Sequence, residues 1–255
     1  MLRALFGLLH RVRQLGVRLR LRRWAWRTRV RLRSCGCRVD IVIGAGVRCA
    51  TVPTVRIVGP AGGSFTLRIA DRVDLGSTLL LDIDSSATSE LTIGEATTFE
   101  HAVRLQLLGG RIDLGPRCEV RDGAVLKASA PDAVLSIGEH VKIGRSAALH
   151  CHQSLVVEDL VTLAERVTVV DSFHDVDGSD EWTMLRPTGS APVRIARNAM
   201  VLSGAVIMHG TSIGRSAVVS ANALVPGGEH AAGVVLLGNP ARTVRRLDAA
   251  QVTDG

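Results

Sequence analysis

The sequence predicts an all-β solenoid, a parallel β-helix preceded by a basic amphipathic helical segment, and three observations support this prediction. An apolar residue returns at every sixth position over much of the chain, apolar residues make up 46% of it while aromatic residues make up 3%, and arginine is concentrated at the N-terminus. Aliphatic side chains with few aromatic rings fill a narrow prism better than a wide globular core. Because a solenoid grows by adding coils, we expect one continuous domain.

The six-residue repeat defines the expected strands. It is unbroken near the C-terminus and recurs in several runs upstream, where Ala87 fills the fourth position of the first run. Its members are Ile195, Val201, Ile207, Ile213, Val219 and Val225, preceded by Ile69, Leu75, Leu81, Ile93, Phe99 and Leu105, by Leu114, Val120 and Leu126, and by Ile137, Ile143, Leu149, Leu155, Val157, Leu163 and Val169. A period of six fits neither an α-helix nor simple strand alternation, whereas each hexad of a β-helix supplies a short strand and a turn. A sandwich, the alternative, places turns at spacings of about 8–12 residues.

The repeat and the charge divide the chain into three segments. Residues 1–33 form the basic amphipathic segment, residues 34–247 form the β-helix, and residues 248–255 form a flexible tail. Within the β-helix, residues 170–194 carry no repeat and are expected to form a loop outside the coils. A long polar loop that leaves a regular solenoid usually carries function, because regular coils already satisfy their backbone groups.

The basic segment contains eleven arginines and no acidic residue within 33 positions, whereas the rest of the chain is mildly acidic. Residues 1–16 have leucine and valine at helical spacing and predict an amphipathic helix, and residues 17–33 fit either a helix or an extended chain. Arginine mixed with Trp24, Trp26 and leucine favours contact with an anionic membrane surface. A helical cap on the open end of the solenoid is the alternative, compatible with the first. Nucleic-acid binding is disfavoured, because the chain has no known reading motif and its body is acidic.

The lengths of the apolar runs and the spacing of the cysteines predict the localisation and the redox state of the protein. Its apolar runs are shorter than the roughly 18–20 residues that span a bilayer, and the short stretch at 4–9 is not followed by a secretory cleavage site. We therefore expect a cytoplasmic protein, peripheral at the inner face of the membrane through residues 1–33. The five cysteines match no zinc-binding spacing, which favours buried, reduced thiols.

The segment that lacks the repeat supplies the candidate chemistry. It contains one histidine, His174, with Asp171 and Asp175 close to it in sequence. An imidazole accepts a proton near neutral pH, and a carboxylate partner can orient it and raise its basicity. The three residues are therefore candidate catalytic residues, with His174 as general base.

The hexads, the histidine-bearing loop that ends in Ser-Ala-Pro-Val-Arg-Ile at 190–195, and the sequence Leu-Gly-Asn-Pro-Ala-Arg-Thr-Val-Arg at 237–245 resemble the hexapeptide-repeat acyltransferases. The similarity covers about residues 40–247 and is greatest to the maltose/galactoside and polysaccharide O-acetyltransferase branch. This resemblance implies a left-handed β-helix that forms a homotrimer, with active sites in the clefts between subunits. It also implies transfer of an acetyl group from acetyl-CoA to a hydroxyl of a sugar, glycolipid or polysaccharide precursor, with no metal.

The resemblance carries roles onto particular residues. Ser203, Ala221 and Asn222 match positions that line the pantetheine arm of the cofactor, with a backbone N–H near Ser203 facing the oxyanion. The arginines that match the cationic positions near the phosphates of CoA are Arg242 and Arg245. Candidate acceptor-binding residues are His150, His152 and Trp182. The chain departs from the family at Met200, where tryptophan is common, at Ser-Ala-Asn-Ala (220–223), where Gly-Ala-Gly-Ser is frequent, and at 226–228, where a lysine is missing.

Two other functions share this fold. A γ-type carbonic anhydrase needs three histidines at subunit junctions, with two of them separated by four residues, and the pair His150 and His152 with distant His174 does not fit that pattern. A non-catalytic scaffold that assembles through its basic segment is the second alternative. Neither the acceptor nor the length of the acyl group follows from the sequence.

Overall fold

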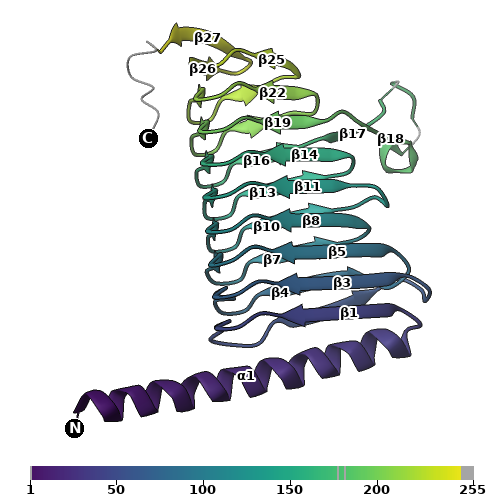
Figure 1. Ribbon diagram of the computed structural model, residues 1–255. Helices are drawn as coiled ribbons and strands as arrows, with labels where there is room; N and C mark the ends of the chain where they lie inside the picture. Colours follow the sequence, from purple (N-terminus) through teal and green to yellow (C-terminus); the bar gives the residue numbers. More distant parts are fainter. Residues whose placement is uncertain (1, 177, 181, 248–255) are drawn as a thin grey trace.

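The computed structural model describes residues 2–176, 178–180 and 182–247, with side chains described from residue 15 onward. The predicted tail at 248–255 lies outside the described residues. The chain forms a left-handed parallel β-helix behind one N-terminal helix, α1 (Leu2–Ser34). Figure 1 shows the coils stacked one on the next, with α1 lying across the first coil and a two-stranded projection near the other end.

Each complete coil passes through three parallel sheets in the order A, B, C. Sheet A contains β1 (Arg38–Ile43), β3 (Ser64–Ile69), β5 (Thr88–Ile93), β8 (Gly110–Leu114), β11 (Val134–Ile137), β14 (Ser154–Val157), β19 (Val193–Ile195), β22 (Thr211–Ile213) and β25 (Gly228–His230). Sheet B contains β6 (Thr98–Phe99), β9 (Glu119–Val120), β12 (Lys142–Ile143), β15 (Thr162–Leu163), β20 (Met200–Val201), β23 (Val218–Val219), β26 (Val234–Gly238) and β27 (Ala241–Arg246), the last antiparallel to β26. Sheet C contains β2 (Thr54–Val58), β4 (Leu80–Asp84), β7 (Arg104–Leu107), β10 (Val125–Ala128), β13 (Ala148–Cys151), β16 (Thr168–Val170), β21 (Val206–Ile207) and β24 (Leu224–Val225).

The coils shorten toward the C-terminus. Arg38 pairs with Ser64, 26 positions later, whereas Ile195 pairs with Ile213, 18 positions later. Only the shorter coil is the three-hexad coil that the repeat predicts, and the longer coils have their extra residues at the corner between sheets C and A. Ala87 lies half-buried in that corner, between β4 and β5. Its expected place in the six-residue register was therefore wrong, because the corner interrupts the repeat there.

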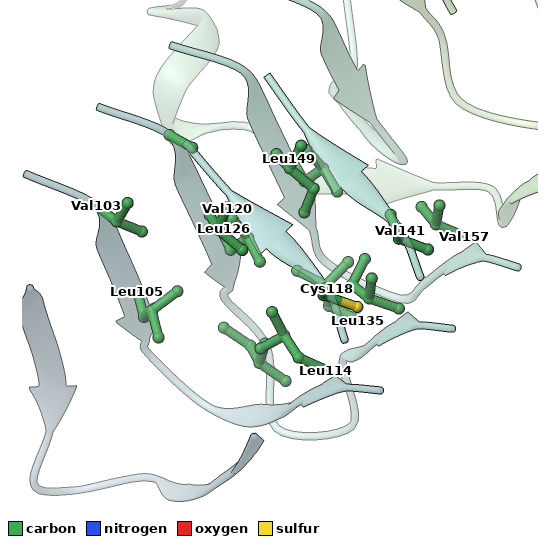
Figure 2. Packing of buried hydrophobic residues seen from close by; sticks show 14 of the residues in the cluster. Val103, Leu105, Leu114, Cys118, Val120, Leu126, Leu135, Val141, Leu149 and Val157 are labelled. Carbon is green, nitrogen blue, oxygen red and sulfur yellow. The ribbon is translucent and has the colours of Figure 1, made fainter. Parts of the chain in front are cut away.

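The apolar members of the repeat form one continuous core along the axis. Leu105, Leu126, Leu149 and Ile207 are fully buried, as is nearly every other predicted position. Figure 2 shows Leu105, Leu126 and Leu149, which belong to successive coils, stacked on one another inside the solenoid. Coils of this kind stabilise each other because a single coil cannot bury its inward side chains on both sides.

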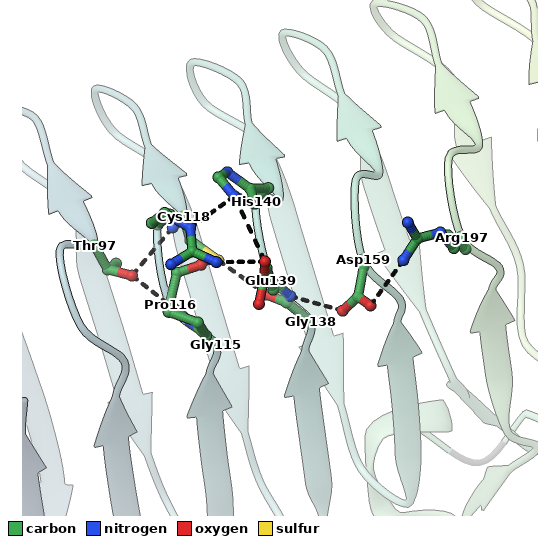
Figure 3. Close-up of polar contacts among 10 residues, drawn as sticks. Thr97, Gly115, Pro116, Cys118, Gly138, Glu139, His140, Asp159 and Arg197 are labelled. Atoms are coloured by element: carbon green, nitrogen blue, oxygen red, sulfur yellow. Dashed lines mark hydrogen bonds and ion pairs between the residues drawn. The ribbon is translucent and has the colours of Figure 1, made fainter. Parts of the chain in front are cut away.

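Polar side chains link successive coils at the corner between sheets A and B (Figure 3). The Thr97 hydroxyl donates to the Gly115 carbonyl at 2.8 Å and accepts from the Cys118 N–H at 3.1 Å. Farther along, the Asp159 carboxylate accepts the Glu139 N–H at 2.8 Å and pairs with Arg197 at 3.3 Å. These contacts satisfy backbone groups that the turns leave outside the sheet ladders.

Helix α1 covers the N-terminal end of the solenoid. It is helical through residue 34, so residues 17–33 are helix and not extended chain. Val17, Leu21, Trp24 and Leu32 are buried within the same core cluster as the first coils, and Arg31 donates to the Val55 carbonyl at 3.3 Å. The helix therefore closes the open end of the core, as the cap interpretation predicts. Within the described part of the chain, no helix is long and apolar enough to cross a membrane.

Candidate active site

The segment without the repeat leaves the solenoid between β16 and β19 as a hairpin. Its strands are β17 (Ser172–His174) and β18 (Thr188–Ser190), which pair antiparallel, and a short 3-10 turn, η1 (Thr183–Leu185), lies between them. Figure 1 shows this hairpin projecting from the stack of coils. The loop that the sequence predicts at 170–194 therefore has an ordered base with His174 at its outer end.

The hairpin is fixed to the solenoid by an aromatic contact. The Phe173 ring lies 4.4 Å from the His209 ring, centroid to centroid, at an interplanar angle of 36°. A Cβ on Gly189 would come within 2.4 Å of the Phe173 ring, so the ring lies directly over this glycine. His209 was not singled out by the sequence interpretation. It lies two residues beyond Ile207, at the corner where the hairpin leaves, and counting the register across the insertion would have found it.

His174 is half-buried, and its Nδ1 atom is shielded from solvent. That nitrogen has no hydrogen-bond partner among the described residues. Within the same part of the chain, no hydrogen bond joins His174 to Asp171 or to the exposed Asp175. The structure thus gives His174 a sheltered imidazole, but it does not pair it with either of the aspartates that flank it in sequence.

Asp171 has a different role from the one expected. Its carboxylate is fully buried and accepts the backbone N–H groups of His152, Gln153 and Ser154 at 2.7, 2.8 and 2.9 Å. The Asp171 carbonyl also accepts the Ala191 N–H at 2.8 Å, which ties the two ends of the insertion together. Both carboxylate oxygens are therefore engaged at the corner beneath the hairpin, and Asp171 fixes where the hairpin begins.

The candidate acceptor-binding residues do not share one surface. His152 lies at the corner that Asp171 holds, whereas His150 lies on the outward face of sheet C, with Lys127 and Val170 as its strand neighbours. Burial lowers the pKa of His150, and the Lys127 charge lowers it further. Trp182 is largely exposed in the hairpin. His152 is thus the one that the coil places at the base of the His174 hairpin.

The predicted cofactor residues lie on the corner between sheets B and C. Val201 pairs with Val219, so Ser203 and Ala221 occupy equivalent positions in successive coils. The Ser203 carbonyl accepts the Asn222 N–H at 3.0 Å, and the Ser203 hydroxyl donates to Glu165 at 3.0 Å. A backbone hydrogen bond from Glu165 itself lowers the pKa of that carboxyl, and the bond from Ser203 lowers it further. The structure therefore brings Ser203, Ala221 and Asn222 together along one edge of the solenoid.

The two candidate arginines lie at the same end of the molecule. Both are exposed on β27, where Arg242 pairs with Leu237 and Arg245 pairs with Val235 of β26. Because β26 pairs in turn with β23, Arg245 lies beyond Val218 in sheet B. The arginines thus extend the outward face of the sheet that ends at the Ser203 corner.

The hairpin and the Ser203 corner lie at opposite ends of one strand. Ser203 precedes β21 and His209 follows it. Ser203 and Gly204 lie in the turn before β21, and His209 lies in the turn after it, so the width of sheet C separates the two corners. A single chain therefore does not bring His174 and the cofactor corner together. Among the described residues, no group of three or more histidine, cysteine, aspartate or glutamate side chains is arranged to hold a metal ion.

Comparison with known proteins finds a relative by sequence. A stretch of 109 residues, 43% of this chain, is 30% identical to a Schizosaccharomyces pombe protein named "Putative serine acetyltransferase". The match spans 36% of the length of that protein. No family model matches the chain.

Solved structures of acyltransferases are also similar to the chain. The polySia specific acetyltransferase NeuO shares 15% identity at a TM-score of 0.49, covering 83% of this chain and 80% of its own. A mutant of AntD, an N-acyltransferase from Bacillus cereus in complex with dTDP and coenzyme A, shares 14% at 0.47, covering 64% and 86%. A hexapeptide-repeat-containing acetyltransferase from Vibrio cholerae, complexed with acetyl coenzyme A, shares 17% at 0.33, covering 85% and 74%. By its six-residue repeat, its left-handed β-helix and the stretch shared with the yeast protein, the chain is similar to the hexapeptide-repeat acyltransferases, as its sequence predicts.

Proposed function

We propose that the protein transfers an acetyl group from acetyl-CoA to a hydroxyl of a sugar, glycolipid or polysaccharide precursor, and that it does so as a homotrimer with His174 as general base. The observation that carries this proposal is that the hairpin with His174 is separated from the corner with Ser203, Ala221 and Asn222. His174 lies on a hairpin at one end of β21, and the cofactor corner lies at the other. A neighbouring copy that presents its Ser203 corner to this hairpin completes a site in the cleft between subunits.

The donor half of the site uses the corner between sheets B and C. The pantetheine arm lies along Ser203, Ala221 and Asn222, and Arg242 and Arg245 take the phosphates, a role that guanidinium groups suit well. Two observations support this assignment. Ser203 in one coil stacks on Ala221 and Asn222 in the next coil, and both arginines are exposed at the same end. CoA or acetyl-CoA is bound in two of the similar solved structures.

The chemical step is direct transfer. An imidazole nitrogen of His174 takes the proton of the acceptor hydroxyl while the hydroxyl oxygen attacks the thioester carbonyl of acetyl-CoA. The backbone N–H near Ser203 of the neighbouring subunit donates to the oxyanion that forms. The carbon–sulfur bond then breaks, and the CoA sulfur takes the proton. The half-buried position of His174, with its Nδ1 atom shielded from solvent, supports this role because water is excluded from one side of the imidazole.

Acetyl transfer is tested by the release of free CoA from acetyl-CoA in the presence of a panel of sugars and oligosaccharides. His174→Ala should lower kcat by about 10²–10⁴-fold, the usual contribution of a general base, without changing the melting temperature. His101→Ala, at an exposed corner several coils away, is the matched control and should keep full activity. Activity of His174→Ala within a few-fold of the unaltered protein would refute the assignment.

Sharing of the site between subunits is tested by mixing two inactive variants. His174→Ala lacks the base, and Ala221→Trp fills the cofactor corner. After co-refolding of equal amounts, about a quarter of the clefts should combine an intact hairpin with an intact corner, and activity should return to that level. If both halves of the site came from one chain, the mixture would stay inactive.

A further inference from the structure

Helix α1 has a second apolar stripe that the solenoid does not cover. One side of the helix packs against the first coils through the buried residues Val17, Leu21, Trp24 and Leu32. The opposite side presents Leu15, Leu19, Trp26 and Val30, whose exposed fractions are 59%, 57%, 62% and 47%. At about 100° per residue these four side chains gather within a narrow arc on the far side of the helix from the buried stripe. A cap needs only one apolar side.

The outer stripe is bordered by unpaired cations. Arg22, Arg23, Arg27 and Arg33 are all exposed, and none of them pairs with a carboxylate among the described residues. Many arginines of the solenoid behave differently, as in the pairs Arg68–Asp40 and Arg48–Asp74, both at 3.2 Å. The positive charge of these four arginines therefore faces away from the solenoid together with the exposed apolar residues.

We propose that this outer face of α1, made by the four apolar residues and the four arginines beside them, binds the surface of an anionic lipid bilayer. A helix whose apolar stripe is bordered by arginines lies in the plane of such a surface, with tryptophan at the headgroup level and each cation attracted to acidic lipid. A second copy of α1 does not fit, because it would bring arginines against arginines. An RNA or DNA duplex would engage the arginines but leave the leucine stripe in water.

If α1 lies on the bilayer, the distance from the lipid surface to the candidate active site is fixed. The solenoid rises from α1 (Figure 1), and in sheet A the strand beside the hairpin, β19, is the sixth along from β1. Six strand spacings of about 4.8 Å and a helix diameter of about 10 Å place the hairpin about 40 Å above the lipid. If the proposed acetyl transfer holds, the acceptor on a membrane is a hydroxyl in the outer part of a long lipid-linked glycan, not a hydroxyl next to the headgroup.

Co-sedimentation of the full-length protein with vesicles tests the binding face. Vesicles of phosphatidylcholine with phosphatidylglycerol should bind the protein at low salt and release it as ionic strength rises, and pure phosphatidylcholine should bind it weakly. A charge variant and an apolar variant should each bind at least about tenfold more weakly to the anionic vesicles. The charge variant is Arg22→Gln, Arg23→Gln, Arg27→Gln and Arg33→Gln, and the apolar variant is Leu15→Ser, Leu19→Ser, Trp26→Ser and Val30→Ser.

Two controls separate the lipid face from the cap and from net charge. Both variants leave the buried stripe intact, so their melting temperatures should equal that of the unaltered protein. A solenoid variant with the same loss of charge, in which Arg72, Arg117, Arg145 and Arg197 are changed to Gln, should bind vesicles like the unaltered protein. Three outcomes would overturn the proposal. The two helix variants could bind vesicles as well as the unaltered protein does, or the solenoid variant could lose as much binding as the helix variants. The third is tighter binding of the protein to a duplex nucleic acid than to anionic vesicles.

The height is tested with vesicle-bound enzyme and lipid-linked glycans of increasing length. Acetylation should begin only when the glycan is long enough to extend about 40 Å from the bilayer. A short lipid-linked sugar acetylated as fast as a long one would overturn the stated geometry. Vesicle binding without acetyl transfer to any acceptor, soluble or lipid-linked, would instead count against the proposed function and leave the lipid face standing.

Discussion

Asp171 lies at the corner where the hairpin leaves the solenoid. Its single buried carboxylate accepts three backbone N–H groups there. Asp171→Ala should lower the free energy of unfolding by about 2–4 kcal/mol, because those donors lose a charged acceptor in a buried corner. Urea unfolding followed by circular dichroism measures this loss. Asp175→Ala is the control and should stay within about 0.5 kcal/mol, since Asp175 is exposed. An Asp171→Ala variant as stable as the control would show that the corner does not need its carboxylate.

Cys151 should be the thiol most resistant to alkylation at pH 8. Burial raises the pKa of Cys151 from 9.0 to about 12, and the Asp171 carboxylate beside it adds to the rise. Only about one thiol in 10⁴ is then ionised at pH 8. Iodoacetamide should therefore modify the half-buried Cys35 first and Cys151 last, as peptide mass spectrometry can follow. Early modification of Cys151 in folded protein would contradict this order.

The same thiol makes stability depend on pH in a definite direction. Its pKa is higher in the folded than in the unfolded chain, so its contribution is fully present below pH 9.0 and is lost as pH rises toward about 12. In that window ionisation of this thiol lowers the free energy of unfolding by about 1.4 kcal/mol per pH unit. Cys151→Ala should flatten the decline in urea midpoint between pH 9 and pH 10.5. An unchanged slope would mean that the thiol does not titrate as its burial implies.

At the scale of elements, the hairpin of β17 and β18 is positioned by contact with the solenoid and not by a hydrophobic core of its own. Gly189→Ala would push a methyl group against the Phe173 ring and move the hairpin off His209. Displacement of about 1 Å at a catalytic base costs up to 10²-fold in rate, so kcat should fall by at least about tenfold.

The core does not include the hairpin, so the free energy of unfolding of Gly189→Ala should stay within about 0.5 kcal/mol of the starting value. Ser190→Ala, the exposed neighbour on the same strand, should keep both activity and stability. A fully active Gly189→Ala enzyme would show that the contact of Phe173 with His209 does not position His174.

The elements differ in how far the sequence could predict them. The strands were predictable because their inward side chains, from Ile69 to Val225, are the repeat itself, and these side chains are buried. The corner beneath the insertion was not predictable, because its contacts join residues 17 to 19 positions apart, from Asp171 to the amides at 152–154. In α1 the alternation Val-Arg-Leu-Arg-Leu at 17–21 resembles a strand, yet Val17 and Leu21 share the buried side and Leu19 faces outward. Two apolar sides on one helix produce that alternation.

For the molecule as a whole, the outward-facing side chains of the solenoid differ between its two ends. Near α1 the outward faces are charged, as in sheet C, where Arg56 and Gln106 both bond to the buried Asp82 at 2.9 Å. Toward the other end one outward column of that sheet becomes mostly apolar, with Val125, Ala148, Thr168, Val206 and Leu224 in register, beside a column that holds Lys127 and His150. Sheet B carries a second column there, Met200, Val218 and Val235. Two different apolar faces at one end suit a ring in which sheet C of one copy packs on sheet B of the next.

The proposed homotrimer can therefore be disrupted at one outward position without disturbing the coils. Val206→Glu places a carboxylate in the middle of the apolar column of sheet C, while its neighbour Ile207 still fills the core. Burying that unpaired charge between subunits costs several kcal/mol, so the variant should be a monomer by light scattering and should lose acetyl transfer together with its trimer. Ser212→Glu, on the outward face of sheet A, is the control and should remain a trimer with full activity. A Val206→Glu protein that is monomeric and fully active would show that one chain holds a complete site, and a trimeric one would place the subunit contact on another face.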